Sequence, residues 1–211
     1  MIKVFISSLA LIIFFVSSLA HAEQRDFQKI LSILEKDAEV KAFIPCYLNV
    51  YTNAVCLVTE KVVVEGESEF HKRSFLVYNI ERGKADRIFL YEQEEYSGLL
   101  EITQVDHLTT MAIWATGSAT IITLFRVIDK EIKLVLEIGS KFSPEIVDLS
   151  GDFIPEILIS RGEWIVEKDG HREFRPVKTS IYKFQKDKSK YVETQVVPWK
   201  DRFTISEQKP K

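Results

Sequence analysis

A pair of strand-like segments joined by a charged turn occurs three times in this 211-residue chain. The leading segments are short and rich in apolar residues, and they cover 75–80, 123–128 and 180–184. Each runs into a turn rich in charged residues, and a second alternating segment follows at 88–91, 134–137 and 191–194. Alternation with a period of two is typical of β-strands. If Leu76, Leu124 and Ile181 are equivalent, the repeats are spaced by 48 and 57 residues.

The residues before each of these hairpins match more loosely. Val105-Asp106 and Val147-Asp148 each end an apolar run before a turn, and residues 111–117 then align with 156–162. A four-strand unit of this period is the signature of propeller blades and related β arrays, although any two amphipathic hairpins share some likeness. We therefore predict a mainly β fold of three four-stranded antiparallel, propeller-blade-like meanders. Their expected bounds are about 45–92, 97–139 and 142–197, within one domain at 45–200 that is followed by a C-terminal tail at 201–211.

Three such units do not close a propeller, which usually has four to eight blades. Unpaired sheet edges promote aggregation, so something is expected to cover them. The sequence offers an N-terminal helix, a polar excursion at 163–177 that lengthens the third unit, or a second subunit. A homo-oligomer formed through an open sheet edge therefore remains one of three alternatives.

The first 22 residues have the pattern of a secretory signal peptide. Lys3 provides the positive start, an apolar run follows from Val4 to Val16, and Ala20-His21-Ala22 places small residues at a cleavage site. The run is shorter than a lasting membrane span needs. We expect cleavage after Ala22, a periplasmic or secreted mature protein, and no stable membrane span after cleavage. Lys3 is the only charged residue removed, so the net charge changes from −3 to about −4.

Residues 23–44 are predicted to contain an amphipathic helix, from Gln24 to Phe43. Asp26 is a suitable N-cap, and Pro45 would end the helix. Its apolar face has the i, i+3, i+4, i+7 spacing and consists of Phe27, Ile30, Leu31, Leu34 and Ala38. A narrow apolar stripe normally packs on its own protein, so we expect the helix to cover a sheet; a partner-binding helix is the alternative.

Cys46 and Cys56 are the two cysteines of the chain. An even number of cysteines in an exported protein favours a disulfide. Residues 47–51 and 55–58 resemble strands joined at Thr52-Asn53, which would place the two cysteines opposite each other in a hairpin. On the chain-entropy model, closing this loop contributes about 3 kcal/mol. Two buried thiols are the alternative.

The turn at residues 148–156 is the strongest motif in the sequence, and it reads Asp-Leu-Ser-Gly-Asp-Phe-Ile-Pro-Glu. It resembles the calcium-binding turn of the FG-GAP and VCBS repeat family, whose pattern is close to D-x-[DN]-G-D-G-x-x-[DP]-E. The resemblance implies propeller-like β repeats and a calcium site whose candidate ligands are Asp148, Ser150, Asp152 and Glu156. Calcium takes six to eight oxygen ligands, which such a turn can supply in large part.

Two residues of this turn depart from the family pattern. Ser150 replaces a carboxylate or amide ligand with a neutral hydroxyl, and Phe153 replaces a glycine at a position that commonly needs a positive φ angle. We therefore favour a structural turn in which Asp148 accepts hydrogen bonds from backbone amides. Calcium remains the alternative cofactor, and no other cofactor is indicated.

The sequence contains no constellation that specifies a reaction. His71, His107 and His171 lie in polar turns and match no metal or catalytic motif, and the negative charge gives no reason to expect a nucleic-acid partner. We expect a non-enzymatic exported β-repeat domain that binds a protein, peptide or envelope component. The alternatives are an envelope hydrolase using carboxylates at 148–173, with Glu156 or Glu163 essential, and a structural calcium module.

Two further expectations concern aromatic and basic side chains. Aromatic residues of β arrays mostly pack between sheets, so Trp114, Trp164 and Trp199 are expected in the core. The lysines near the last hairpin are expected to form a solvated basic tip, and they are Lys183, Lys186, Lys188 and Lys190.

Overall fold

A computed structural model describes residues 28, 30, 32–34, 38–48, 51–66, 68–81, 84–93 and 98–202. The expected signal peptide at 1–22, most of the expected helix, and the end of the expected tail lie outside these residues. Among the described residues, no helix is long and apolar enough to cross a membrane.

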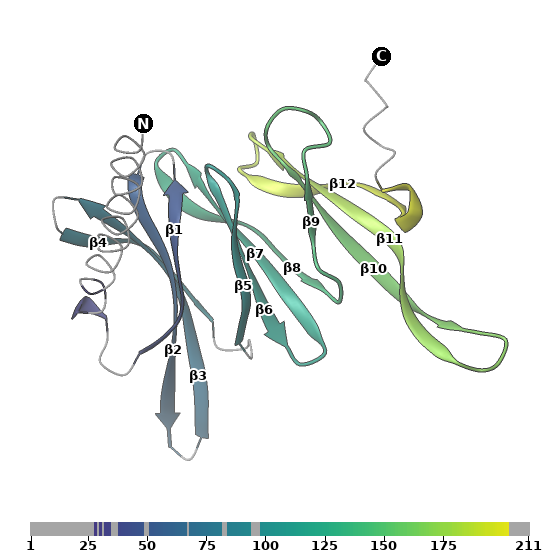
Figure 1. Cartoon of the computed structure of the whole chain (residues 1–211), viewed down its shortest axis with the longest axis horizontal. Helices are drawn as coiled ribbons and strands as arrows, with labels where there is room; N and C mark the ends of the chain where they lie inside the picture. Colours follow the sequence, from purple (N-terminus) through teal and green to yellow (C-terminus); the bar gives the residue numbers. More distant parts are fainter. Residues whose placement is uncertain are drawn as a thin grey trace, which may run out of the picture.

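The described chain forms three four-stranded antiparallel sheets, each a meander of consecutive strands (Figure 1). The first sheet contains β1 (Glu39–Leu48), β2 (Tyr51–Glu65), β3 (Ser68–Glu81) and β4 (Lys84–Gln93). The second contains β5 (Gly98–Asp106), β6 (Thr109–Thr116), β7 (Ala119–Ile128) and β8 (Glu131–Ser140). The third contains β9 (Glu145–Val147), β10 (Glu156–Val166), β11 (Arg172–Gln185) and β12 (Lys190–Pro198). The prediction of a mainly β fold with three four-stranded antiparallel meanders is confirmed.

The sheets stack face to face, and the second sheet lies between the other two (Figure 1). Cys56, Phe75 and Val77 of the first sheet pack against Trp114 and Phe125 of the second. The opposite face of the second sheet packs against the third sheet. The buried side chains that the two sheets contribute to this second cluster are Met111, Ile113, Ile122, Leu124, Val135, Leu136, Ile157, Ile159, Tyr182 and Tyr191. Because both faces of β6 and β7 are buried, these strands are nearly continuously apolar.

The facing directions correct one predicted equivalence between the repeats. Leu124 faces the third sheet, whereas Leu76 points away from the second sheet into the outer cluster of the first. A shift of one residue moves a strand side chain to the opposite face. In each sheet a bulge interrupts the pairing of the third and fourth strands, directly after Val77, Leu124 and Ile181 of the third strand. These three residues are therefore equivalent, and the first repeat was predicted one residue out of register.

The predicted helix from Gln24 to Phe43 is wrong at its C-terminal end, because β1 begins at Glu39. Ala42 and Ile44 pack toward the second sheet, and Val40 and Phe43 pack on the outer face. Both faces of this sheet are covered, so apolar residues at adjacent positions fit a strand as well as a helix. Pro45, expected to end the helix, lies within β1, which is an edge strand and tolerates proline.

Only part of the predicted helix is described. Gln28, Ile30, Ser32 and Ile33 have helical backbone, and the Leu34 amide donates to the Ile30 carbonyl at 3.2 Å. Ile30 is fully buried against Leu57, Leu76 and Tyr78 on the outer face of the first sheet. At Ile30 and Leu34 the apolar stripe thus packs on a sheet. The helix as a whole remains a prediction.

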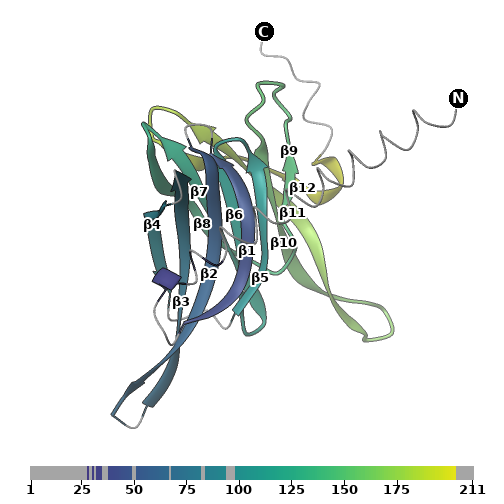
Figure 2. The ribbon, with the colours of Figure 1, turned by 60° about the vertical axis from the view of Figure 1, so that its left-hand side comes forward.

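The polar excursion expected at 163–177 is an extension of the β10–β11 hairpin. Residues 162–166 pair with 172–176, beyond the pairing with β9 and β12. The β2–β3 hairpin is extended in the same way by residues 61–65 and 68–72. Figures 1 and 2 show both ribbons projecting from the same end of the stack.

The tryptophan prediction is confirmed for one residue and wrong for two. Trp114 is fully buried and donates its indole N–H to Thr123 Oγ1 at 2.9 Å. Trp164 is 64% exposed because it lies on the projecting β10–β11 ribbon, where it contacts Phe174 edge to face. Trp199 is also largely exposed and stacks under the Arg202 guanidinium.

Residues 201 and 202, expected in the tail, belong to the fold. Asp201 is the last residue of a short 3-10 helix, η1 (Trp199–Asp201), and Arg202 follows it, with its Nε 2.7 Å from Glu145 Oε1 on β9. This ion pair fastens the chain after β12 to the first strand of the same sheet.

The first hairpin differs from the one expected around the cysteines. β1 ends at Leu48 and β2 begins at Tyr51, so the connection does not lie at Thr52-Asn53. Cys46 pairs with Ala54, and Cys56 with Ile44, which places the cysteines diagonally on one face instead of directly opposite each other. The described residues include no free cysteine, but the side chain of Cys46 lies outside them, and the disulfide stays a prediction.

Candidate functional site

The acidic loop at 148–156 connects β9 to β10 and has the turn geometry expected for Asp148. One carboxylate oxygen of Asp148, Oδ1, accepts the Gly151 and Asp152 amides at 2.8 and 3.2 Å. The other, Oδ2, accepts the Phe153 amide at 3.0 Å. Asp148 therefore holds the loop by capping its backbone donors, as in an Asx-turn.

Glu156 is the buried carboxylate of the loop, with 3% of the residue exposed. It accepts the Leu149 amide and the Ser150 hydroxyl, each at 2.8 Å. The predicted candidate ligands Ser150 and Glu156 are thus bonded to each other. A buried carboxylate needs such donors, because desolvation strongly disfavours an unpaired charge.

Lys183 on β11 is the cation of this loop. Its Nζ atom lies 3.3 Å from Glu156 Oε1 and 3.4 Å from Asp152 Oδ2. Burial alone would lower the pKa of Lys183, but the two carboxylates outweigh it and raise the pKa above its ordinary value. Burial opposes ionisation of Asp152 too, yet the Ile154 amide and Lys183 lower the pKa of its carboxyl. Lys183 was predicted at a solvated tip, and that prediction is wrong.

Phe153 occupies the loop with a φ angle of 61° and is 84% exposed. Gly151 also has positive φ, at 69°. The loop thus keeps the backbone form that the glycine of the family pattern would favour, at the cost of strain in a bulky residue.

The four candidate calcium ligands do not fit a calcium ion in this arrangement. Both oxygens of Asp148 accept backbone amides, and Asp152 and Glu156 each have one oxygen on a backbone amide and one beside the Lys183 ammonium. Within the described part of the chain, no set of three or more His, Cys, Asp or Glu residues is grouped to hold a metal. No role for calcium is assigned to this loop.

A comparable arrangement occurs in the second sheet. Arg126 is equivalent to Lys183, since each lies two residues after the matched Leu124 and Ile181. The Nη1 atom of Arg126 lies 2.7 Å from Asp106 Oδ2, and Asp106 Oδ1 accepts the Leu108 amide at 2.7 Å. Arg126 also stacks over the Phe184 ring at 4.6 Å. This pair is buried between the second and third sheets.

The carboxylates considered for hydrolysis have differing surroundings. Asp152 and Glu156 lie together beside Lys183, whose single positive charge pairs with one oxygen of each. Glu163 lies opposite Arg175 in the strand register of the projecting ribbon. Asp169 lies beyond the last register pair of that ribbon, Val166 with Arg172. Three residues of strand separate Glu163 from that end, or about 10 Å. Glu163 and Asp169, one possible pair among the carboxylates at 148–173, are therefore not brought together.

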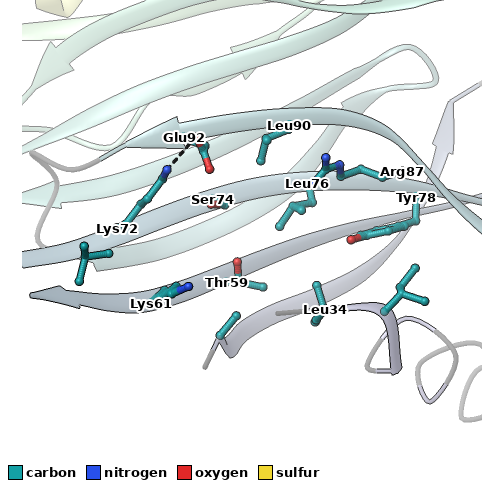
Figure 3. A pocket seen from close by; sticks show the side chains of 13 residues that line it. Leu34, Thr59, Lys61, Lys72, Ser74, Leu76, Tyr78, Arg87, Leu90 and Glu92 are labelled. Carbon is teal, nitrogen blue, oxygen red and sulfur yellow. Dashed lines mark ion pairs between the residues drawn. The ribbon is translucent and has the colours of Figure 1, made fainter. Parts of the chain in front are cut away.

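A pocket of about 340 Å³ lies on the outer face of the first sheet (Figure 3). Its floor is formed by side chains of β2, β3 and β4, and one wall by the segment that includes Ile33 and Leu34. The lining residues are Ile33, Leu34, Ala38, Thr59, Lys61, Val63, Lys72, Ser74, Leu76, Tyr78, Arg87, Leu90 and Glu92. Seven of these thirteen side chains are polar or charged, and a cavity of this size lies within the range of small-ligand sites.

The polar groups of the pocket form cross-strand rows. Thr59, Ser74 and Glu92 are neighbours in one row, and Tyr78 lies beside Arg87 in another. Lys72 pairs with Glu92 at 2.9 Å. Burial raises the pKa of Tyr78, and the charge of Arg87 offsets part of that rise. Among the described lining residues three side chains are basic and one is acidic, so these residues together carry a positive surplus although the chain is acidic overall.

Sequence reasoning did not identify this pocket. The alternation of Thr59, Lys61 and Val63 places these side chains on one face of β2, and Ser74, Leu76 and Tyr78 share one face of β3. That signal was present in the sequence. It did not reveal that this face points away from the stack and is only partly covered.

Comparison with protein-family models finds no match to this chain, and comparison with curated proteins finds none either.

Proposed function

We propose that this protein is an exported, non-enzymatic binding domain whose ligand site is the pocket on the outer face of the first sheet. The observation that supports this is the combination of a ligand-sized cavity with a positive surplus from Lys61, Lys72 and Arg87. The ligand would be a peptide or envelope component with an anionic group beside an apolar group.

Each part of the ligand has a matching part of the pocket. Leu76, Leu90 and Val63 supply apolar surface, while Thr59 and Ser74 supply hydroxyls for hydrogen bonds. Basic side chains at the rim attract a carboxylate or phosphate over a distance of about 10 Å at moderate salt. The β-repeat architecture of the FG-GAP and VCBS type is compatible with such a recognition role.

A matched pair of small probes tests the proposal. N-acetyl-leucyl-glutamate carries an apolar side chain and carboxylates, and its diamide is the uncharged counterpart. We expect amide NMR shifts on β2, β3 and β4 with the carboxylate form and much smaller ones with the diamide. Shifts of equal size with both forms, or shifts confined to other sheets, would refute the proposed site.

Substitutions then connect binding to the pocket charges. Lys61→Gln and Arg87→Gln should each weaken binding about threefold to tenfold, because one charge within several ångströms of an anion is lost near the surface. Lys168→Gln, on the tip of the β10–β11 ribbon, is the control and should leave the affinity unchanged. Higher salt should weaken wild-type binding more than binding by either pocket variant.

Export is a separate part of the proposal and rests on the sequence of residues 1–22 and on Cys46 and Cys56. Mass spectrometry of the protein from the envelope should give a mature chain beginning at Glu23. The same protein should contain no thiol that reacts under denaturing conditions before reduction. Two titratable thiols would exclude the disulfide while leaving the binding site untouched.

A further inference from the structure

The second and third sheets share a pairing between a basic third strand and an acidic first turn. Arg126 and Lys183 occupy equivalent positions on β7 and β11. Arg126 pairs with Asp106, which follows the first strand of its sheet, and Lys183 pairs with Asp152 and Glu156 in the corresponding turn. In both turns a carboxylate oxygen also accepts a backbone amide. Asp106 Oδ1 accepts the Leu108 amide, and Asp148 Oδ1 accepts the Gly151 amide. The recurrence at matched positions argues against an accidental surface contact.

In the third sheet this pairing lies inside a turn that resembles a calcium loop. A calcium ion would hold such a turn by drawing several anionic oxygens to one point. Here the Lys183 ammonium lies within 3.4 Å of an oxygen from the middle of the turn, on Asp152, and of one from its end, on Glu156. The Glu156 side chain is almost fully buried, with 4% exposed, so its charge requires a partner within the protein.

We propose that the Lys183 ammonium is the built-in cation of the 148–156 loop and makes the shape of that loop independent of calcium. The positive group is supplied by the neighbouring strand of the same sheet. A divalent ion placed on Asp152 and Glu156 would lie a few ångströms from the ammonium, and the two positive charges would repel. The same carboxylates therefore serve either the lysine or a metal.

Replacement of Lys183 by a neutral residue should therefore create a calcium response that the wild-type protein lacks. Without the ammonium, the oxygens of Ser150, Asp152 and Glu156 form an anionic cluster without its cation. Calcium added to such a variant gains a place to bind at these oxygens. The wild-type protein should be indifferent to calcium, and the variant should respond to it.

The test uses the mature wild-type protein and Lys183→Gln, which removes the charge but keeps a hydrogen-bond donor. In EDTA the variant should melt about 3–8 °C below wild type. Millimolar CaCl₂ should shift the wild-type melting temperature by no more than about 1 °C. It should raise the melting temperature of the variant by about 3 °C or more. Calorimetry should give the variant a calcium Kd on the order of 10⁻⁴–10⁻³ M.

Lys188→Gln is the matched control, because Lys188 is exposed on the turn that follows the same strand. It should behave as wild type with and without calcium. Lys183→Arg keeps the charge and should also remain unresponsive to calcium, so it and wild type decide the question if Lys183→Gln does not fold.

Two results would overturn the inference. One is a clear calcium-induced rise in the melting temperature of the wild-type protein or of Lys183→Arg. The other is a folded Lys183→Gln that melts with the Lys188→Gln control and shows no response to calcium. Folding of Lys183→Gln in calcium but not in EDTA would support the inference.

Discussion

The rings of Phe75 and Phe125 stack with their centroids 4.3 Å apart and their planes 10° from parallel. This contact joins β3 of the first sheet to β7 of the second, and both side chains are almost fully buried. Phe89 and Tyr91 of β4 meet the Phe125 ring edge to face, at 5.4 and 5.2 Å. Phe125 is thus the aromatic centre of the interface between the first two sheets.

Phe125→Ala should lower the free energy of unfolding by about 3–5 kcal/mol, because it removes a large buried ring and leaves a cavity. Urea denaturation followed by circular dichroism measures this change. Leu100→Ala is the control, since Leu100 is 61% exposed on β5. It should change stability by less than about 0.5 kcal/mol. A loss below about 1.5 kcal/mol for Phe125→Ala would contradict the face-to-face packing.

Arg126→Ala should be strongly destabilising, by about 3–5 kcal/mol, because it leaves Asp106 buried without its cation. The side chains of Arg126 and Asp106 are only 6% and 7% exposed. Arg161→Ala provides a contrast, since Arg161 pairs with Glu193 at the surface, with exposures of 54% and 36%. Loss of an exposed pair should cost at most about 1 kcal/mol. Equal unfolding energies for the two variants would show that the Arg126 pair is not buried.

Phe153→Gly should stabilise the protein by about 0.5–1 kcal/mol, because glycine adopts the φ angle of 61° without the strain of a Cβ atom. Phe153→Ala separates this effect from loss of the ring, since alanine retains the strain. We expect Phe153→Ala to leave the melting temperature near that of wild type. If alanine and glycine give the same gain, the cause is the exposed ring and not the backbone.

Stability should fall as the pH drops below about 4.5 in part because of Glu60. Burial opposes ionisation of Glu60, but the His71 hydrogen bond and the Arg73 charge outweigh it and lower the pKa of Glu60 below the ordinary 4.5. A carboxyl whose folded pKa is depressed contributes stability above its unfolded pKa, and that stability is lost as the pH falls through the folded pKa. Urea midpoints measured from pH 7 to pH 2 follow this loss.

Glu60→Gln should flatten that part of the pH profile, whereas Glu131→Gln should leave it unchanged. Glu131 pairs with Lys133 at the surface and is well exposed. A Glu60→Gln profile parallel to that of wild type would mean that Glu60 does not contribute to the acid sensitivity.

The repeat was predictable because it is written in local alternation and turn composition. Segments such as 123–128 and 134–137 are rich in apolar residues and are separated by a charged turn that begins at Asp129-Lys130, so strand type and order follow from short-range patterns. The capping role of Asp148 was predictable for the same reason, since its partners lie within five residues of it.

Errors arose where the outcome depends on contacts between distant segments. Residues 39–43 were predicted as the end of a helix because they follow the apolar stripe that runs to Ala38, whereas the structure covers both faces of the first sheet and makes them part of a strand. Leu76 was matched one residue out of register because the face of a strand is fixed by the sheet that packs on it.

The sequence by itself determined the mainly β class, the three meanders and the Asp148 turn, because each depends on neighbouring residues. Only the tertiary structure decided which faces are covered and which charges meet. It brought Lys183 to Glu156 across 27 residues of chain, since the pairing of Ile157 with Tyr182 places β10 and β11 side by side. It also left the outer face of the first sheet partly open as a positively charged pocket.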